Sequence, residues 1–184
     1  MALRYVTGLE VDEVYAHLPI ILRPRTLEDH FTAYCLLNNG AEALVRASQI
    51  SIGHKNDHGL EVVGEKGTLI WRQETPEELR LMLDGYPDLV YYRGAVQNPD
   101  PILGELPEVL MAEPTLPSGH PEGFHDALGR LHRSFERVVR AYNTGASWVC
   151  DGSEFATVTD GRISMEFLDA ALTSNDNDSE GTDI

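Results

Sequence analysis

The order of the hydrophobic patterns constrains the fold of this chain more than any other feature of its sequence. Residues 10–22 contain apolar side chains at every second position from Val14 to Leu22, which is typical of a strand with one face against a core. Glycine-containing reversals follow at residues 38–40, 64–67 and 84–85, each between two strand-like runs. The middle of the chain is therefore predicted to form an antiparallel meander.

The last third of the chain has helical spacing instead. From Pro121 onward, apolar residues recur every three or four positions and form one stripe. This stripe consists of Phe124, Leu128, Leu131, Phe135, Val138, Val139 and Tyr142. Gly145 is expected to end the helix, and a second helix is expected to follow Asp160. Strands grouped before helices predict an α+β fold, with a mostly antiparallel open sheet and helices packed on one face.

Two segments show neither the two-residue spacing of a strand nor the helical spacing. Residues 98–117 contain five prolines, which interrupt helices and strands alike, and are predicted to form a connecting loop. Residues 175–184 are acidic and almost devoid of apolar side chains, so we expect a disordered tail. The predicted domain thus covers residues 1–174.

The charge balance excludes some classes of partner. The chain has 14 basic and 30 acidic side chains and a formal net charge of -16, with only Lys55 and Lys66 as lysines. Nucleic acid is not expected to bind, because phosphate contacts need clustered Lys or Arg. There is no apolar run of the roughly 20 residues that span a bilayer and no leader pattern at the start, so we expect no membrane association and a cytoplasmic protein. Cys35 and Cys150 are expected to be reduced thiols.

Histidines are the first candidates for a functional site. His54 and His58 have the spacing of a helical metal-binding pair, but the glycines that flank them favour a solvated loop, and we predict no metal site. His120 precedes a predicted helix start, and Glu122 lies in its first turn. A neutral imidazole there can donate a hydrogen bond to a substrate hydroxyl, whereas a purely structural role as a helix cap explains the same residues. Spacing alone leaves both interpretations open.

Three ordered segments carry a resemblance to a known family. They are residues 63–79, which include GEKGTLIWRQETPEEL, the segment GHPEGF at residues 119–124, and residues 157–170. The sequence from Leu3 to Leu172 resembles the carboxy-terminal domain of the glucose-fructose oxidoreductase, inositol dehydrogenase and rhizopine catabolism (Gfo/Idh/MocA) family. Members of that family are two-domain, NAD- or NADP-dependent sugar or polyol oxidoreductases, in which this domain walls the substrate pocket and commonly builds the oligomer.

The resemblance also implies which catalytic and cofactor-binding parts of such an enzyme are not expected in these 184 residues. No GxGxxG loop occurs in them, and the lysine and the Asp/His pair that are catalytic in the family have no counterparts, so we expect no catalytic residue, no bound cofactor and no turnover by this chain alone. The expected function is that of the substrate-pocket and oligomerisation domain without its Rossmann domain. The residues expected to face the substrate are His120 and Glu122, then His54 and Gln49. The open sheet face is expected to form a homo-oligomer. The alternative is a freestanding dimeric α+β binding or scaffold module.

Overall fold

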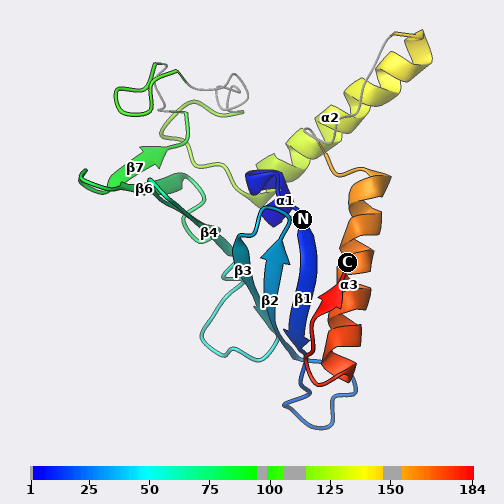
Figure 1. Cartoon of the computed structure of the whole chain (residues 1–184). Coiled ribbons are helices and arrows are strands. Elements are labelled where there is room, and N and C mark those ends of the chain that lie inside the picture. The colour runs from blue at the N-terminus through cyan, green and yellow to red at the C-terminus, as the bar shows by residue number, and fades with distance from the viewer. Residues whose placement is uncertain (1, 95–98, 106–114, 147–154) are drawn as a thin grey trace. The chain divides into compact units, whose positions relative to one another are not determined.

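The computed structural model describes residues 2–94, 99–105, 115–146 and 155–184. They form two compact units, which are drawn in Figure 1. Unit 1 comprises the described residues of 1–54 and 149–184, and unit 2 those of 55–148. The predicted α+β class with an antiparallel open-sheet fold is confirmed, but the strands form two sheets of four and not the single sheet expected. Cys150 and the predicted loop prolines Pro107 and Pro114 lie outside the described residues.

Unit 1 is a sheet covered by one long helix. Its antiparallel strand order is β3-β2-β1-β8. The elements are α1 (Ala2–Thr7), β1 (Val11–His17), β2 (His30–Leu37), β3 (Glu42–Ser48), α3 (Val158–Asp176) and β8 (Thr182–Asp183). In Figure 1, α3 runs alongside β1. Small residues on the helix, Ala170 and Ala171, pack against Val14 and Ala16 of β1, so the alternation in the sequence is confirmed there as a buried face.

β1 ends earlier than the apolar alternation predicts. It stops at His17, and Ile20 and Leu22 are about half exposed. The buried Asp29 carboxylate accepts hydrogen bonds from the backbone N–H groups of Ile21 and Leu22, both at 2.9 Å. The backbone of this segment is therefore held in a loop by a side chain, which replaces the strand partner that the sequence pattern assumed.

The acidic end of the chain differs from the disordered tail expected for residues 175–184. α3 continues to Asp176, and β8 then pairs with β1 through Glu13↔Asp183 and Val14↔Thr182. The Ser174 hydroxyl fastens the turn, because it donates to the Glu180 carbonyl at 2.6 Å and accepts from the Ala16 N–H at 2.9 Å. Strand pairing uses backbone groups, so the polar side chains that suggested disorder do not prevent it.

Unit 2 is a four-stranded meander followed by a helix. Its strand order is β4-β5-β6-β7, as the two glycine-containing reversals at residues 64–67 and 84–85 predict in part. The elements are β4 (Gly59–Gly64), β5 (Gly67–Arg72), β6 (Glu78–Leu83), β7 (Leu89–Tyr92) and α2 (Phe124–Thr144). Gly145 ends α2 in the left-handed conformation, as expected, but the helix begins three residues after Pro121. No helix in the described ranges is both long and apolar enough to cross a bilayer.

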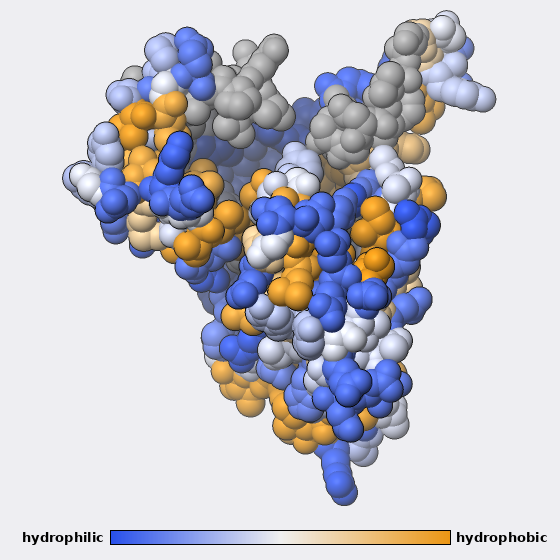
Figure 2. Space-filling model, viewed as in Figure 1, coloured by the Kyte–Doolittle hydropathy of each residue, from blue (hydrophilic) through white to orange (hydrophobic). Residues whose placement is uncertain are grey.

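One face of the unit 2 sheet is apolar throughout. Cross-strand pairs place on the same face Leu60, Val62, Leu69, Trp71, Leu79, Leu81, Leu89 and Tyr91. Leu81 is buried, whereas Leu69 and Leu79 are more than a third exposed. Figure 2 shows hydrophobic surface over β6 and β7 among charged residues. This sheet therefore presents an apolar face that is only partly covered.

Candidate functional site

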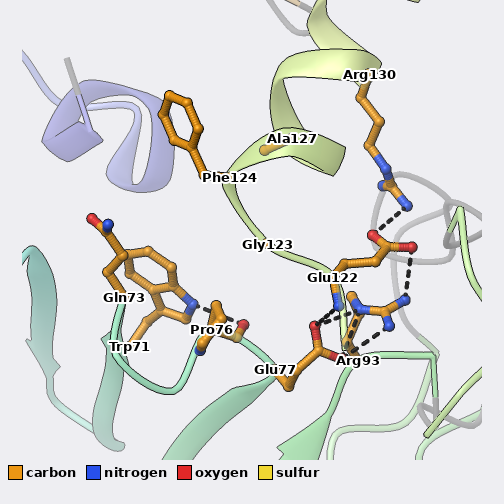
Figure 3. Close-up of a pocket in the computed structure, with 10 residues that line it drawn as sticks. All are labelled: Trp71, Gln73, Pro76, Glu77, Arg93, Glu122, Gly123, Phe124, Ala127 and Arg130. Atoms are coloured by element: carbon orange, nitrogen blue, oxygen red, sulfur yellow. Dashed lines mark hydrogen bonds and ion pairs between the residues drawn. The ribbon is translucent and has the colours of Figure 1, made fainter. Parts of the chain in front are cut away.

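A pocket in unit 2 combines two of the sequence segments singled out above. Its volume is about 420 Å³, and Figure 3 shows its walls. They come from β5 and the loop after it, from the end of β7, and from the start of α2. The lining residues are Trp71, Gln73, Pro76, Glu77, Arg93, Glu122, Gly123, Phe124, Ala127 and Arg130.

The first wall is aromatic and apolar. The Trp71 indole N–H donates to the Pro76 carbonyl at 3.2 Å, and the His58 ring meets the indole edge-on with centroids 5.8 Å apart. The indole is therefore held in place with its polar atom satisfied. Gln73 accepts a hydrogen bond from the Asn56 amide at 2.7 Å, which leaves its own NH₂ group as a donor on this wall. Phe124, at the first position of α2, is largely exposed.

The second wall is built around Arg93, the residue after β7. Its Nε lies 3.0 and 2.9 Å from the two carboxylate oxygens of Glu77, and Nη2 also reaches Glu77 Oε2 at 2.9 Å. The remaining N–H groups donate to the His120 carbonyl at 2.6 Å and to the Leu116 carbonyl at 3.3 Å. Arg93 thus joins the end of the sheet to the turn that precedes α2.

Glu122 completes this wall as an acceptor on both carboxylate oxygens. Its side chain is only 8% exposed. Oε1 accepts from Arg93 Nη1 at 3.1 Å and from the Leu116 N–H at 2.6 Å, and Oε2 accepts from Arg130 Nη2 at 3.2 Å. The Glu122 backbone N–H donates in turn to Glu77 Oε1 at 2.9 Å.

The electrostatics of the pocket are balanced. Two carboxylates, Glu77 and Glu122, face two guanidinium groups, Arg93 and Arg130. Hydrogen bonds from the Arg93 side chain hold the pKa of Glu77 below its ordinary value, and Glu77 raises the pKa of Arg93. Glu77 and Arg93 are therefore both ionised near neutral pH, and across the pocket each carboxylate is paired with a guanidinium group. Such a pocket favours a neutral ligand with an apolar face.

The residues predicted to face the substrate belong to both units. Glu122 lines the pocket, and His120 lies on the same turn, with an exposed side chain and its carbonyl bound to Arg93. Gln49 and His54 belong to unit 1, where both are exposed. The Gln49 N–H donates to the Asp29 carbonyl at 2.9 Å, and the His54 N–H to the Ser51 carbonyl at 3.1 Å. His120 and Glu122 are thus brought together in one unit, and Gln49 and His54 in the other.

Four of the lining residues were not predicted to face the substrate: Trp71, Gln73, Arg93 and Phe124. Trp71 and Gln73 belong to a segment that carries the family resemblance, and this signal could have singled them out. Arg93 has no local signal, because its partners lie 16 to 29 residues away. His54 and His58 lie in a loop, as predicted, and no cluster of three or more metal-binding side chains occurs in the ranges that the structure describes. Burial raises the pKa of the Cys35 thiol to about 11, so it stays protonated.

Comparison with known proteins confirms the resemblance. Residues 1–70 match the GFO/IDH/MocA C-terminal domain, a stretch that ends just before the pocket residues. The uncharacterized oxidoreductase YfiI of Bacillus subtilis (strain 168) is 27% identical over 117 residues, which are 64% of this chain and 28% of that protein.

Solved structures extend the similarity over the whole chain. An oxidoreductase from Sinorhizobium meliloti is 27% identical with a TM-score of 0.81, covering 97% of this chain and 48% of that one. An inositol dehydrogenase homolog from Azotobacter vinelandii, complexed with NAD+, is 21% identical with a TM-score of 0.87, covering 100% and 45%. A levoglucosan dehydrogenase in complex with NADH and levoglucosan is 20% identical with a TM-score of 0.70, covering 99% and 47%. This chain therefore spans about half the length of these solved structures.

Proposed function

We propose that this chain, whose residues 1–70 match the GFO/IDH/MocA C-terminal domain, is the substrate-pocket and oligomerisation domain of an NAD- or NADP-dependent sugar or polyol oxidoreductase. The neighbours that share its fold include proteins crystallised with NAD+ and with NADH and levoglucosan. Such an enzyme would act in the cytoplasm. In it, a nicotinamide cofactor supplies the hydride transfer, while the protein binds and orients the substrate.

The observation that carries the proposal is the pocket of unit 2. A sugar or cyclitol ring is neutral, has apolar C–H faces and carries hydroxyl groups on its rim. The fixed Trp71 indole offers a stacking surface for the C–H face, and the Gln73 amide offers a donor to a hydroxyl. The balanced charges of the second wall suit an uncharged ligand. His120 and Glu122 would stand at one side of it, with His54 and Gln49 as further candidates.

The nicotinamide cofactor does not fit the described residues of this chain. Phosphates bind to free N–H groups at helix N-termini, but at both long helices the N-cap N–H is already paired with a carboxylate of the first turn. At α2, Gly123 N–H donates to Asp126 at 2.9 Å and Glu122 N–H to Glu77 at 2.9 Å. At α3, Thr157 N–H donates to Asp160 at 2.7 Å. A carboxylate at each helix start disfavours a pyrophosphate there.

Oligomerisation would use the apolar face of the unit 2 sheet, with a second copy of this chain as its occupant. Leu69 and Leu79, on neighbouring strands, are both more than a third exposed on that face. Burying such a surface against its own copy removes apolar area from water at roughly 25 cal/mol per Å². Leu79→Glu should therefore shift the protein to monomer in light scattering. The control is Val63→Glu, on the other face of the same sheet.

The test of the proposed function is a binding experiment with the purified chain. Calorimetric titration with levoglucosan and myo-inositol should give saturable binding in the millimolar range, as befits a site of one ring and few hydrogen bonds. NADH titrated alone should give none. Micromolar binding of NADH, or no binding of any neutral ring compound, would contradict the proposal.

A further inference from the structure

The charged wall of the pocket is made by segments far apart along the chain. Glu77 precedes β6, Arg93 follows β7, and Glu122 lies in the turn before α2. The Arg93 guanidinium contacts the other two segments at once. It pairs with the carboxylates of Glu77 and Glu122 and donates hydrogen bonds to the carbonyls of Leu116 and His120. The turn is thereby fastened to the end of the sheet at several points.

Glu122 has little acceptor capacity left for a ligand. Both of its carboxylate oxygens already accept hydrogen bonds, and the side chain is only 8% exposed. One of these hydrogen bonds comes from the Leu116 N–H, which belongs to the turn itself. A carboxylate in this situation organises its neighbours more readily than it binds a hydroxyl. Its backbone N–H on Glu77 adds a second link between the same two segments.

Glu77 also connects the charged wall to the aromatic one. It follows Pro76, whose carbonyl accepts the Trp71 indole N–H. A shift of the Glu77 backbone would therefore move the acceptor that holds the indole. Phe124 lies two residues after Glu122, so a shift of the turn would also move Phe124.

We propose that Glu77, Arg93 and Glu122 are positioning residues, which form a clasp that fixes the turn before α2 against the end of β7 and so sets the spacing of the pocket's aromatic walls. This inference rests on the proposed function only in naming a neutral ring compound as ligand. Glu122 then acts through Arg93, and not by touching substrate. The planar fork of Arg93 is essential to the clasp, because a lysine has the charge but cannot pair with two carboxylates and two carbonyls together.

The experiment compares the clasp with an ordinary exposed ion pair on α2. Arg93→Lys and Glu122→Gln test the clasp, and Arg140→Lys and Glu136→Gln are matched controls, since the Arg140–Glu136 pair is exposed on α2. All variants carry Trp148→Phe, so that fluorescence reports Trp71, the other of the chain's two tryptophans. The readouts are acrylamide quenching of Trp71 without ligand and the affinity for myo-inositol, with circular dichroism to verify folding.

The clasp variants should increase the quenching of Trp71 and weaken myo-inositol binding about tenfold, which corresponds to 1.4 kcal/mol. The double variant should be no worse than the stronger single one, because both changes break one network. Clasp variants that match the controls in quenching would overturn the proposal, and so would Glu122→Gln if it lost binding without a change in quenching, since Glu122 would then touch the ligand directly. If the parent protein binds no ring compound, the proposed function fails while the quenching comparison still decides the clasp. If Arg93→Lys does not fold, Glu77→Gln replaces it under the same criteria.

Discussion

The two units of this chain are held together in different ways. Unit 1 contains seven of the eight buried apolar residues found in the described part of the chain, gathered where α3 covers β1 and β2. Unit 2 contains one, Leu81, and its pocket is fastened by charged hydrogen bonds around Arg93. Close packing leaves no room for a ligand, whereas a charged clasp can hold walls apart. Unit 1 is therefore stabilised mainly by apolar burial, whereas unit 2 contains the pocket.

The largest expected effect is on the core of unit 1. Val14→Ala removes two methyl groups from a fully buried position and should lower the free energy of unfolding by about 2 to 3 kcal/mol. Urea unfolding followed by circular dichroism measures this loss. The control is Val63→Ala in unit 2, which is 73% exposed and should change stability by at most about 0.5 kcal/mol. Equal losses at the two positions would remove the distinction between the units.

The next effect concerns the buried hydroxyl that fastens the end of the chain. Ser174→Ala leaves the Ala16 N–H and the Glu180 carbonyl without their partner and should cost about 2 kcal/mol. Hydrogen exchange at Asp183 and Ile184 should accelerate, because β8 loses its anchor. Thr173→Ala, on the exposed side of α3, is the control. Unchanged exchange in β8 would show that strand pairing alone holds it.

The core of unit 1, the end of the chain and the pocket show what the sequence could and could not predict. Alternation identified Val14 and Ala16 as core residues, and Gly145 marked the end of α2, because both signals are local. The pairing of β8 was missed because backbone groups, and not side chains, make it. Arg93 was missed because its partners are distant in sequence. Glu122 was found by its position at a helix start, but its environment, which local spacing does not encode, favours a positioning role.

A smaller effect is expected at the start of α3. The Thr157 hydroxyl accepts from the Asp160 N–H at 3.3 Å, and the Asp160 carboxylate accepts from the Thr157 N–H at 2.7 Å, so the two residues form a capping box. Thr157→Ala should cost about 1 kcal/mol in urea unfolding. Thr157→Ser keeps the hydroxyl and should recover most of the loss. No recovery by serine would point to packing of the methyl group as the cause.

Lowering the pH should destabilise the same helix start. The Thr157 hydroxyl and N–H, together with Arg4, hold the pKa of Asp160 at about 2, below its ordinary 3.8. The unfolded chain therefore takes up this proton at a higher pH than the folded one. The ionised group stabilises unit 1 fully above about pH 4, and the contribution is lost as the pH falls toward 2.

The corresponding variant is Asp160→Asn, which should lower stability at pH 7 and flatten its dependence between pH 4 and 2. Asp169→Asn, at an exposed position of α3, is the control and should leave the dependence unchanged. Thermal midpoints across this range measure both. The loss caused by Val14→Ala should be the same at either end of the range, because apolar burial carries no proton linkage. An unaltered pH dependence in Asp160→Asn would place the acid sensitivity elsewhere.

The most direct test of the pocket is residue-resolved. Chemical-shift mapping of the isotopically labelled protein, titrated with myo-inositol, reports each backbone amide and the Trp71 indole N–H separately. Saturable shifts should centre on Trp71, Gln73 and the turn before α2, and they should be absent in Trp71→Ala. Shifts confined to unit 1, at Gln49 and His54, or no saturable shift at all, would contradict the assignment of the substrate pocket to unit 2.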